Sequence, residues 1–230
     1  MLWNQEPRSR QEFHVMKLRL PRLFRSETSG QSTARAPAAP ASKAAFDLSP
    51  KTEACRVILD HWQLLRGDRL LPRHAEFDPA AVARYLQNVA LFEVRSPELT
   101  FCRLAGTAYR LSLGFELTGM NVNHLYAPEL HRAAGYRFTT MAIRPCAATV
   151  ELSLRFSAQQ QAPHELIFLP LEPDDSGAPP TLLVATAGID DVLWQNTAIL
   201  PQLQASPTFR FIDIGAGIPI STLPPDDFGR

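Results

Sequence analysis

The 230-residue sequence lacks a net charge, a long apolar run and any abundance of cysteine. Its 23 Lys and Arg residues balance 23 Asp and Glu residues, so no excess of cations is available to follow a phosphate backbone. No apolar stretch approaches the ~20 residues that a membrane-spanning helix needs. The composition therefore predicts neither nucleic-acid binding nor stable membrane insertion.

The three cysteines, Cys55, Cys102 and Cys146, are far apart and form no CxxC pair. A disulfide framework needs an even number of cysteines in a short secreted chain, and a zinc site needs clustered ligands. The N-terminus also lacks the uninterrupted apolar core and cleavage site of a signal peptide. We therefore expect reduced thiols, no metal site and a cytoplasmic protein.

Residues 1–46 differ in composition from the rest of the chain. They hold eight Lys and Arg residues against three Asp and Glu, which leaves 15 against 20 for the remainder. Residues 26–45 are rich in Ser, Thr, Ala and Pro and bury too little surface to offset ordering entropy. Residues 13–25 mix basic and bulky apolar side chains, but Pro21 interrupts the amphipathic helix that binding to an anionic membrane requires. We expect a disordered leader, and Met16 offers an alternative start of translation.

Helical signals begin after this leader. Apolar residues recur at three- and four-residue steps over residues 50–66, with Ser49 placed to cap a helix and Gly67 to end it. Asp78 followed by Pro79 is typical of the start of a second, shorter helix. The domain that opens here is predicted to span residues 47–190.

Five β-rich segments follow, interrupted once by helices. The strand-like segments are residues 88–95, 99–105, 148–156, 165–171 and 181–188, and the interruption holds short helical pieces over 107–126 and a helix over 128–143. This order predicts an α+β fold, in which a five-stranded antiparallel sheet carries the helices on one face, with an extra N-terminal helix. Residues 191–230 are expected to form a C-terminal extension packed on the domain, with a helical turn at 192–200, a strand-like piece at 207–214 and a frayed end.

Four sequence segments resemble a known family in their order and spacing. They are His61-Trp62 to Gly67, Leu71-Pro72-Arg73 with Phe77-Asp78-Pro79, Arg103-Leu104-Ala105-Gly106-Thr107, and Gly114-Phe115-Glu116-Leu117-Thr118-Gly119. Together they resemble the PAS-like domain family of small alphaproteobacterial proteins over about residues 50–190. The resemblance implies a sensory or regulatory module without enzymatic activity. Its structural motif residues here would be Trp62, Arg73, Asp78, Arg103, Gly106, Thr107 and Gly119.

The PAS architecture implied by this resemblance places a space between the sheet and the helices of residues 107–143. An empty hole of ~300 Å³ would cost ~7 kcal/mol, so side chains, water or a ligand must fill it. The polar residues expected nearest to this space are Tyr109, His124, Tyr126 and His131. Each is a candidate for ligand binding, and the alternative for each is a structural hydrogen bond to the protein.

Histidine and arginine residues are further candidates for binding a cofactor or an anionic ligand. Haem-binding PAS domains take an axial histidine from this region, so His124 and His131 are the candidates for haem, although no other haem signature is present. Arg103 is expected to bind the carbonyls of the following turn or to pair with Asp78 or Glu116, and the alternative is an anionic ligand.

The sequence contains none of the catalytic motifs HExxH, GxSxG or a phosphate-binding loop. The leading hypothesis is a non-enzymatic sensor or adaptor in signal transduction that binds a small molecule, a protein partner or both. The alternative is a structural protein-interaction adaptor whose pocket is filled by side chains, and a third is an enzyme with no recognisable motif. The helix at 50–66 would form a homodimer through Ile58, Trp62 and Leu65, unless that face packs on its own sheet.

Overall fold

The structure is a computed structural model, and it describes residues 48–155, 161–189 and 208–224. The predicted leader, the helical turn at 192–200 and the frayed end after residue 224 lie outside the described residues. None of the described helices is long and apolar enough to cross a membrane.

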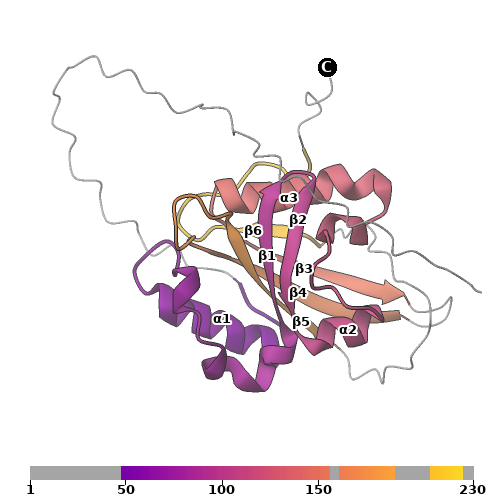
Figure 1. The fold of residues 1–230 in the computed structure, drawn as a ribbon, viewed down its shortest axis with the longest axis horizontal. Coiled ribbons are helices and arrows are strands. Elements are labelled where there is room, and N and C mark those ends of the chain that lie inside the picture. Colours follow the sequence, from indigo (N-terminus) through magenta and orange to yellow (C-terminus); the bar gives the residue numbers. More distant parts are fainter. Residues whose placement is uncertain (1–47, 156–160, 190–207, 225–230) are drawn as a thin grey trace, which may run out of the picture. The chain divides into compact units, whose positions relative to one another are not determined.

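The described helices and strands follow one another in the order that the sequence predicts. In chain order they are α1 (Glu53–Arg66), η1 (His74–Glu76), η2 (Pro79–Asn88), β1 (Val89–Ser96), β2 (Leu99–Ala105), α2 (Thr107–Leu113), η3 (Val122–Leu125), η4 (Pro128–Leu130), α3 (His131–Ile143), β3 (Ala147–Arg155), β4 (Gln161–Leu171), β5 (Thr181–Gly188) and β6 (Arg210–Ile212). The strands form one sheet in the order β2-β1-β5-β4-β3-β6, and all its pairs are antiparallel (Figure 1). The prediction of an α+β fold with a single antiparallel sheet is confirmed.

The sheet has six strands rather than the predicted five. The added strand, β6, comes from the strand-like piece at 207–214 and pairs with the outer edge of β3, with Ala148 opposite Phe211. Its side chains alternate, so that Phe211 joins the apolar core on one side of the sheet and Ile212 the core on the other. The C-terminal segment therefore extends the sheet instead of only covering it.

Helices cover both faces of the sheet, whereas the sequence predicted them on one face. Along β4, Phe168 points into the core beneath α2 and α3, and its neighbours Ile167 and Leu169 point into the core beneath α1. A strand buried on both faces reads as a continuous apolar run, which is the pattern of residues 166–169. In Figure 1, α3 lies at the top of the fold, where it overlaps the end of the β1–β2 hairpin, and α1 lies at the lower left.

α1 is held on the sheet by its apolar stripe and by its first turn. The cap is Thr52 rather than the predicted Ser49, because the Thr52 side chain accepts from the Cys55 amide. Ile58 and Trp62 are fully buried, and the Trp62 indole donates to the Pro170 carbonyl at 3.0 Å. The face proposed for a homodimer is therefore used for packing within the chain.

On the opposite face, α3 crosses the β1–β2 hairpin at close range. A Cβ atom added at Gly135 would lie 1.8 Å from the carbonyl oxygen of Pro97 in the hairpin turn. Glycine has a low helix propensity, but at this position its missing side chain lets α3 contact the hairpin turn. Between the sheet and the helices α2, η3 and α3 a small space remains.

Candidate functional site

A cavity of about 50 Å³ lies between the sheet and the helices α2, η3 and α3. Its wall is formed by Phe92, Tyr109, Ser112, Leu113, Leu117, Val122, Leu125, Tyr126, Phe138, Leu152, Leu154, His164, Leu166, Phe168 and Thr186. At ~24 cal/mol per Å³, a void of this size costs only ~1 kcal/mol, and it can hold a few waters. Side chains therefore fill most of the space that the sequence predicted.

One end of this mostly apolar wall is polar. His164 on β4, Thr186 on β5 and Ser112 on α2 are all buried there. The His164 Nδ1 lies 3.1 Å from the Ala162 carbonyl oxygen, which only accepts, so this nitrogen carries the proton. The Nε2 atom of the neutral ring then accepts from the Ser112 hydroxyl at 3.4 Å. Burial lowers the pKa of His164 below its usual value near 6.5, which keeps the ring neutral at pH 7.

Tyr109 and Tyr126, two of the four predicted ligand-binding residues, lie in the cavity wall. Tyr109 is buried and its hydroxyl donates to the Val184 carbonyl at 3.2 Å, which ties α2 to β5. Burial raises the pKa of both phenols, that of Tyr109 well above its usual value near 10. Both tyrosines are therefore neutral hydrogen-bonding groups at the cavity, and their contact with a ligand stays a prediction.

The other two, His124 and His131, lie together but outside the cavity wall. Their ring centroids are 5.4 Å apart, and the His131 Nε2 atom donates to the Tyr126 carbonyl at 3.0 Å. An axial haem ligand would have to face the cavity, and His164 is the one histidine among the described residues that does so. A volume of about 50 Å³ is also far too small for a macrocycle. The residues present do not fit haem.

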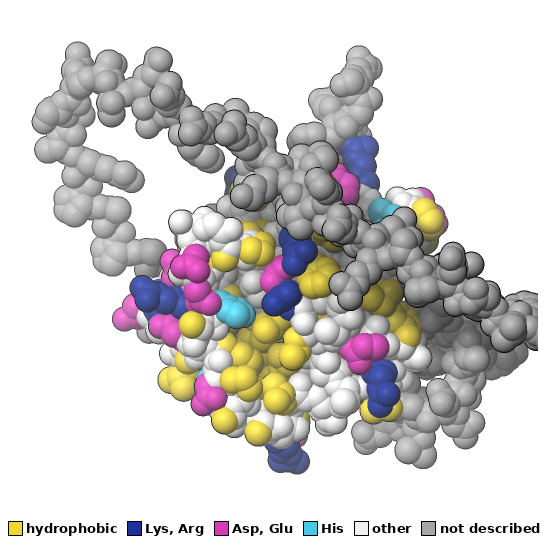
Figure 2. Space-filling view, in the orientation of Figure 1, with side chains coloured by type: hydrophobic (Ala, Val, Ile, Leu, Met, Phe, Trp, Pro, Cys, Tyr) yellow, Lys and Arg dark blue, Asp and Glu magenta, His cyan; other side chains and the backbone are white. Residues whose placement is uncertain are grey.

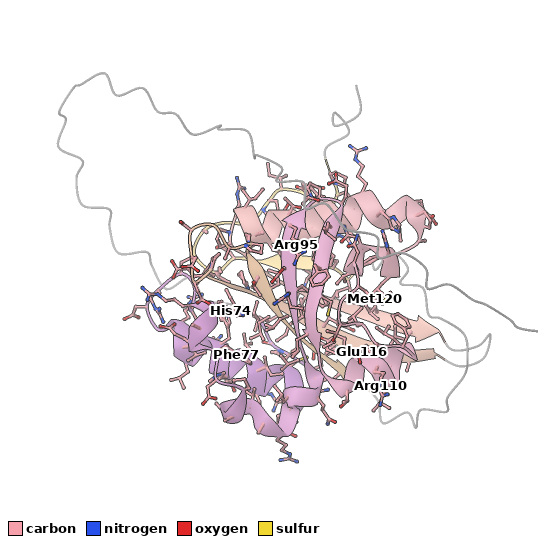
Figure 3. All side chains as sticks on the ribbon, in the orientation of Figure 1. His74, Phe77, Arg95, Arg110, Glu116 and Met120 are labelled. Carbon is pink, nitrogen blue, oxygen red and sulfur yellow. The ribbon has the colours of Figure 1, made fainter. Side chains whose placement is uncertain are left out.

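Arg103 has a different partner from those expected. Its Nε atom lies 2.9 Å from the Glu93 carboxylate on the neighbouring strand β1, and among the described residues no ion pair joins it to Asp78 or Glu116. Because the two strands are paired side by side, this ion pair crosses the hairpin from an exposed arginine to a mostly buried carboxylate. Glu93 also accepts from Arg95, which Figure 3 labels, so the hairpin carries a small charge network.

The remaining motif residues have structural contacts. Asp78 caps η2 by accepting from the Ala80 amide, and Arg73 lies 4.0 Å from Glu172 at the exposed start of η1. Gly106 precedes Thr107, the first residue of α2, and an added Cβ atom there would lie 2.3 Å from the Gln87 carbonyl oxygen. Gly119 has φ of 90°, in the left-handed region that favours glycine.

The cysteines do not provide a reactive site. All three are buried, and burial raises the pKa of Cys55, Cys102 and Cys146 to about 12. Thiols with such pKa values stay protonated at neutral pH and are poor nucleophiles. Within the described ranges, no cluster of three or more His, Cys, Asp or Glu side chains is suited to hold a metal ion.

Sequence reasoning missed the polar end of the cavity. Ser112, His164 and Thr186 come from three separate elements, and nothing local distinguishes them from solvated polar residues. The available signal was positional: His164 and Leu166 share a face of β4 with Phe168, so a histidine continues an apolar stripe.

Comparisons with known proteins agree with this architecture. A profile described as the PAS domain matches residues 50–185, which is more than half of the chain. The match begins just before α1 and ends within β5, and so includes every described residue of the cavity wall except Thr186. A comparison with curated proteins found no match. The chain belongs to the PAS domain family.

Proposed function

We propose that this protein is a non-enzymatic PAS module of signal transduction that binds a small molecule in its core and passes the change in packing to a protein partner. PAS domains are in general sensory or regulatory modules. The observation that carries the proposal is the mostly apolar cavity between the sheet and α2, η3 and α3, with polar groups gathered at one end.

A chain of aromatic rings connects this cavity with the helix and the strand that border it. Phe92 on β1 contacts Phe138 on α3, which contacts Phe168 on β4, with ring centroids 6.3 and 5.9 Å apart. Phe168 in turn lies 6.5 Å from Phe209, just before β6. Because these rings share one packed core, occupancy of the cavity would shift α3 and the C-terminal segment together.

A second candidate function is the structural interaction adaptor that binds no ligand. The cavity volume of about 50 Å³ favours it, because ligand pockets normally begin at ~300 Å³. In that case the domain would act through its surface alone. A protein partner or a homodimer formed through another surface fits either function.

Catalysis has little support from the described residues. Ser112 and His164 form a hydroxyl–imidazole pair, but the 3.4 Å contact is long. A nucleophile also needs donors for a developing oxyanion. The Ser112–His164 pair is better explained as a buried polar contact.

Native purification separates the two candidate functions. An absorption spectrum and an intact mass, taken before and after denaturation, would show a co-purified molecule if the cavity is a ligand site. Absence of such a molecule, together with a thermal midpoint that no member of a metabolite library raises, would favour the adaptor.

A cytoplasmic location and an alphaproteobacterial origin stay predictions of the sequence.

A further inference from the structure

The polar end of the cavity is also the inner wall of a second hollow. This outer groove has a volume of about 200 Å³ and is lined by Gln87, Asn88, Ala108, Leu111, Ser112, His164, Thr186, Ala187 and Gly188. Ser112, His164 and Thr186 line both spaces, so these three side chains separate the cavity from the groove. We call them the polar partition.

The partition is thin for reasons of register. His164 lies directly opposite Gly188 in the β4–β5 pair, so its cross-strand neighbour has no side chain. On α2, Leu111 is 62% exposed while the next residue, Ser112, is buried. The Ser112–His164 hydrogen bond, at 3.4 Å, joins α2 to β4 across the partition.

We propose that the cavity and the outer groove form one binding site for an uncharged amphiphile, whose alkyl chain enters the cavity and whose alcohol or amide head stays in the groove. Separation of the Ser112 hydroxyl from the His164 ring would let the alkyl chain of the ligand pass from the groove into the cavity. The proposal rests on the proposed function, because it takes the cavity as the ligand site. The two volumes together approach the ~300 Å³ at which ligand pockets begin.

The lining residues select against charge. No Lys, Arg, Asp or Glu occurs among the described residues that line either space. An ionised head would lose its hydration without gaining a counter-charge, which is costly, whereas a neutral head can hydrogen-bond to Gln87, Asn88 or Ser112. Arg110 belongs to α2 but is exposed and lines neither space (Figure 3).

The experiment compares four six-carbon probes on the full chain at pH 7.5. Hexan-1-ol and hexanamide are neutral, while hexanoate and hexylammonium have the same chain with a charged head. Backbone amide NMR shifts would be followed during titration with each probe. We expect saturable shifts at Leu166 and Phe168, which line the cavity, and at least tenfold weaker binding of both charged probes.

Two variants and one control test whether the alkyl chain of the ligand enters the cavity through the polar partition. Leu154→Phe enlarges a side chain of the cavity wall and should weaken hexan-1-ol binding at least tenfold. The matched control Leu59→Phe enlarges a side chain in the core under α1 and should leave the affinity unchanged. Ser112→Ala removes the hydrogen bond of the partition without crowding, and should speed association of hexan-1-ol by about two- to tenfold.

Equal affinity for charged and neutral probes would overturn the proposed ligand class. Unchanged binding in Leu154→Phe, or shifts confined to the α1 face, would overturn the site. If no probe binds, the amphiphile site is wrong, but a co-purified molecule of another kind would leave the proposed function standing. If neither a probe nor a co-purified molecule is found, both fail.

Discussion

At the residue scale, Gly135 shows how a contact reverses a local propensity. In an exposed helix, Gly→Ala stabilises by ~1 kcal/mol. Here the new Cβ atom would lie 1.8 Å from the Pro97 carbonyl oxygen, so α3 or the hairpin turn must move. We expect Gly135→Ala to lower the free energy of unfolding by about 1–3 kcal/mol, measured by urea denaturation.

The control for this substitution is Gly177→Ala. Nothing lies within 4 Å of a Cβ atom added at Gly177, and its φ is not in the left-handed region. Its stability should be unchanged or slightly raised, because alanine narrows the unfolded ensemble. Equal behaviour of the two variants would show that α3 does not touch the turn.

Glu165 is a second residue whose role depends on a distant segment. This carboxylate on β4 is 3% exposed and accepts from the amides of Lys51 and Thr52 and from the Thr52 hydroxyl at 2.8–3.0 Å. It thereby satisfies amides at the start of α1, where negative charge is favourable. We expect Glu165→Ala to cost about 2–3 kcal/mol of unfolding free energy.

Glu151 provides the matched control, because it lies directly opposite Glu165 in the β3–β4 pair. Its side chain is 39% exposed and pairs with Lys51 at 2.7 Å. An exposed ion pair contributes less than ~1 kcal/mol, so Glu151→Ala should be nearly neutral in chemical denaturation. A loss as large as that of Glu165→Ala would contradict the capping role.

At the element scale, β6 closes the edge of β3 and contributes to both cores. Phe211 is 7% exposed and its ring centroid lies 5.2 Å from that of Phe209. Truncation of such a side chain removes buried area and leaves a cavity. Phe211→Ala should therefore lower the thermal midpoint markedly, at a cost of about 3 kcal/mol.

Ile220→Ala, in the same C-terminal segment, is the control for this prediction. Ile220 is fully exposed, so its removal should leave the midpoint unchanged. If Phe211→Ala were equally silent, β6 would not be part of the folded domain.

The viewed face of the described part carries both hydrophobic and charged side chains. Figure 2 shows hydrophobic side chains gathered over its lower left and centre, with charged side chains around them. Exposed leucines such as Leu70 and Leu104 are common on folded proteins and do not by themselves define a partner site. The partner of the proposed function has to be found by experiment rather than from one apolar patch.

At the scale of the whole molecule, buried thiols set the alkaline limit of stability. Folding raises the pKa of each cysteine from about 9 to about 12, so between these values the unfolded chain releases protons that the folded chain keeps. The free energy of unfolding must then fall as pH rises above 9, by about 1 kcal/mol per thiol at pH 10. Urea denaturation at pH 8, 9 and 10 would measure this fall, and Cys146→Ala should make it shallower than in the unsubstituted chain.

His164 acts in the opposite direction on the acid side. Its pKa is lowered in the folded protein, so below pH 6.5 the unfolded chain takes up a proton that the folded chain does not. Stability present above pH 6.5 is therefore lost as the pH falls through the folded pKa. His164→Gln should flatten the decline between pH 6.5 and 5, and a decline identical in both proteins would show that this ring titrates normally. The carboxylates with lowered pKa values, Glu76, Glu116 and Asp174, titrate at lower pH.

The sequence by itself determined the elements and their order. Alternation and apolar runs predicted the five main strands, and the Asp78-Pro79 and Gly67 signals predicted where helices begin or end, because these depend on neighbours within one or two turns. The resemblance over four short segments pointed to the PAS fold in part for the same reason, since Asp78 caps a local helix and Gly119 has the left-handed φ of a turn. Trp62, by contrast, donates to the distant Pro170 carbonyl.

Only the tertiary structure decided which distant segments of the chain lie in contact. The burial of both sheet faces, the pairing of β6 with β3, the contact of Gly135 with Pro97 and the partition of Ser112, His164 and Thr186 all join segments distant in sequence. His124 and His131 satisfied the sequence criteria for a site and yet lie outside the cavity, whereas His164 lines it. The direction of a side chain depends on strand register and helix packing, and these arise from the sum of many weak contacts over the whole core.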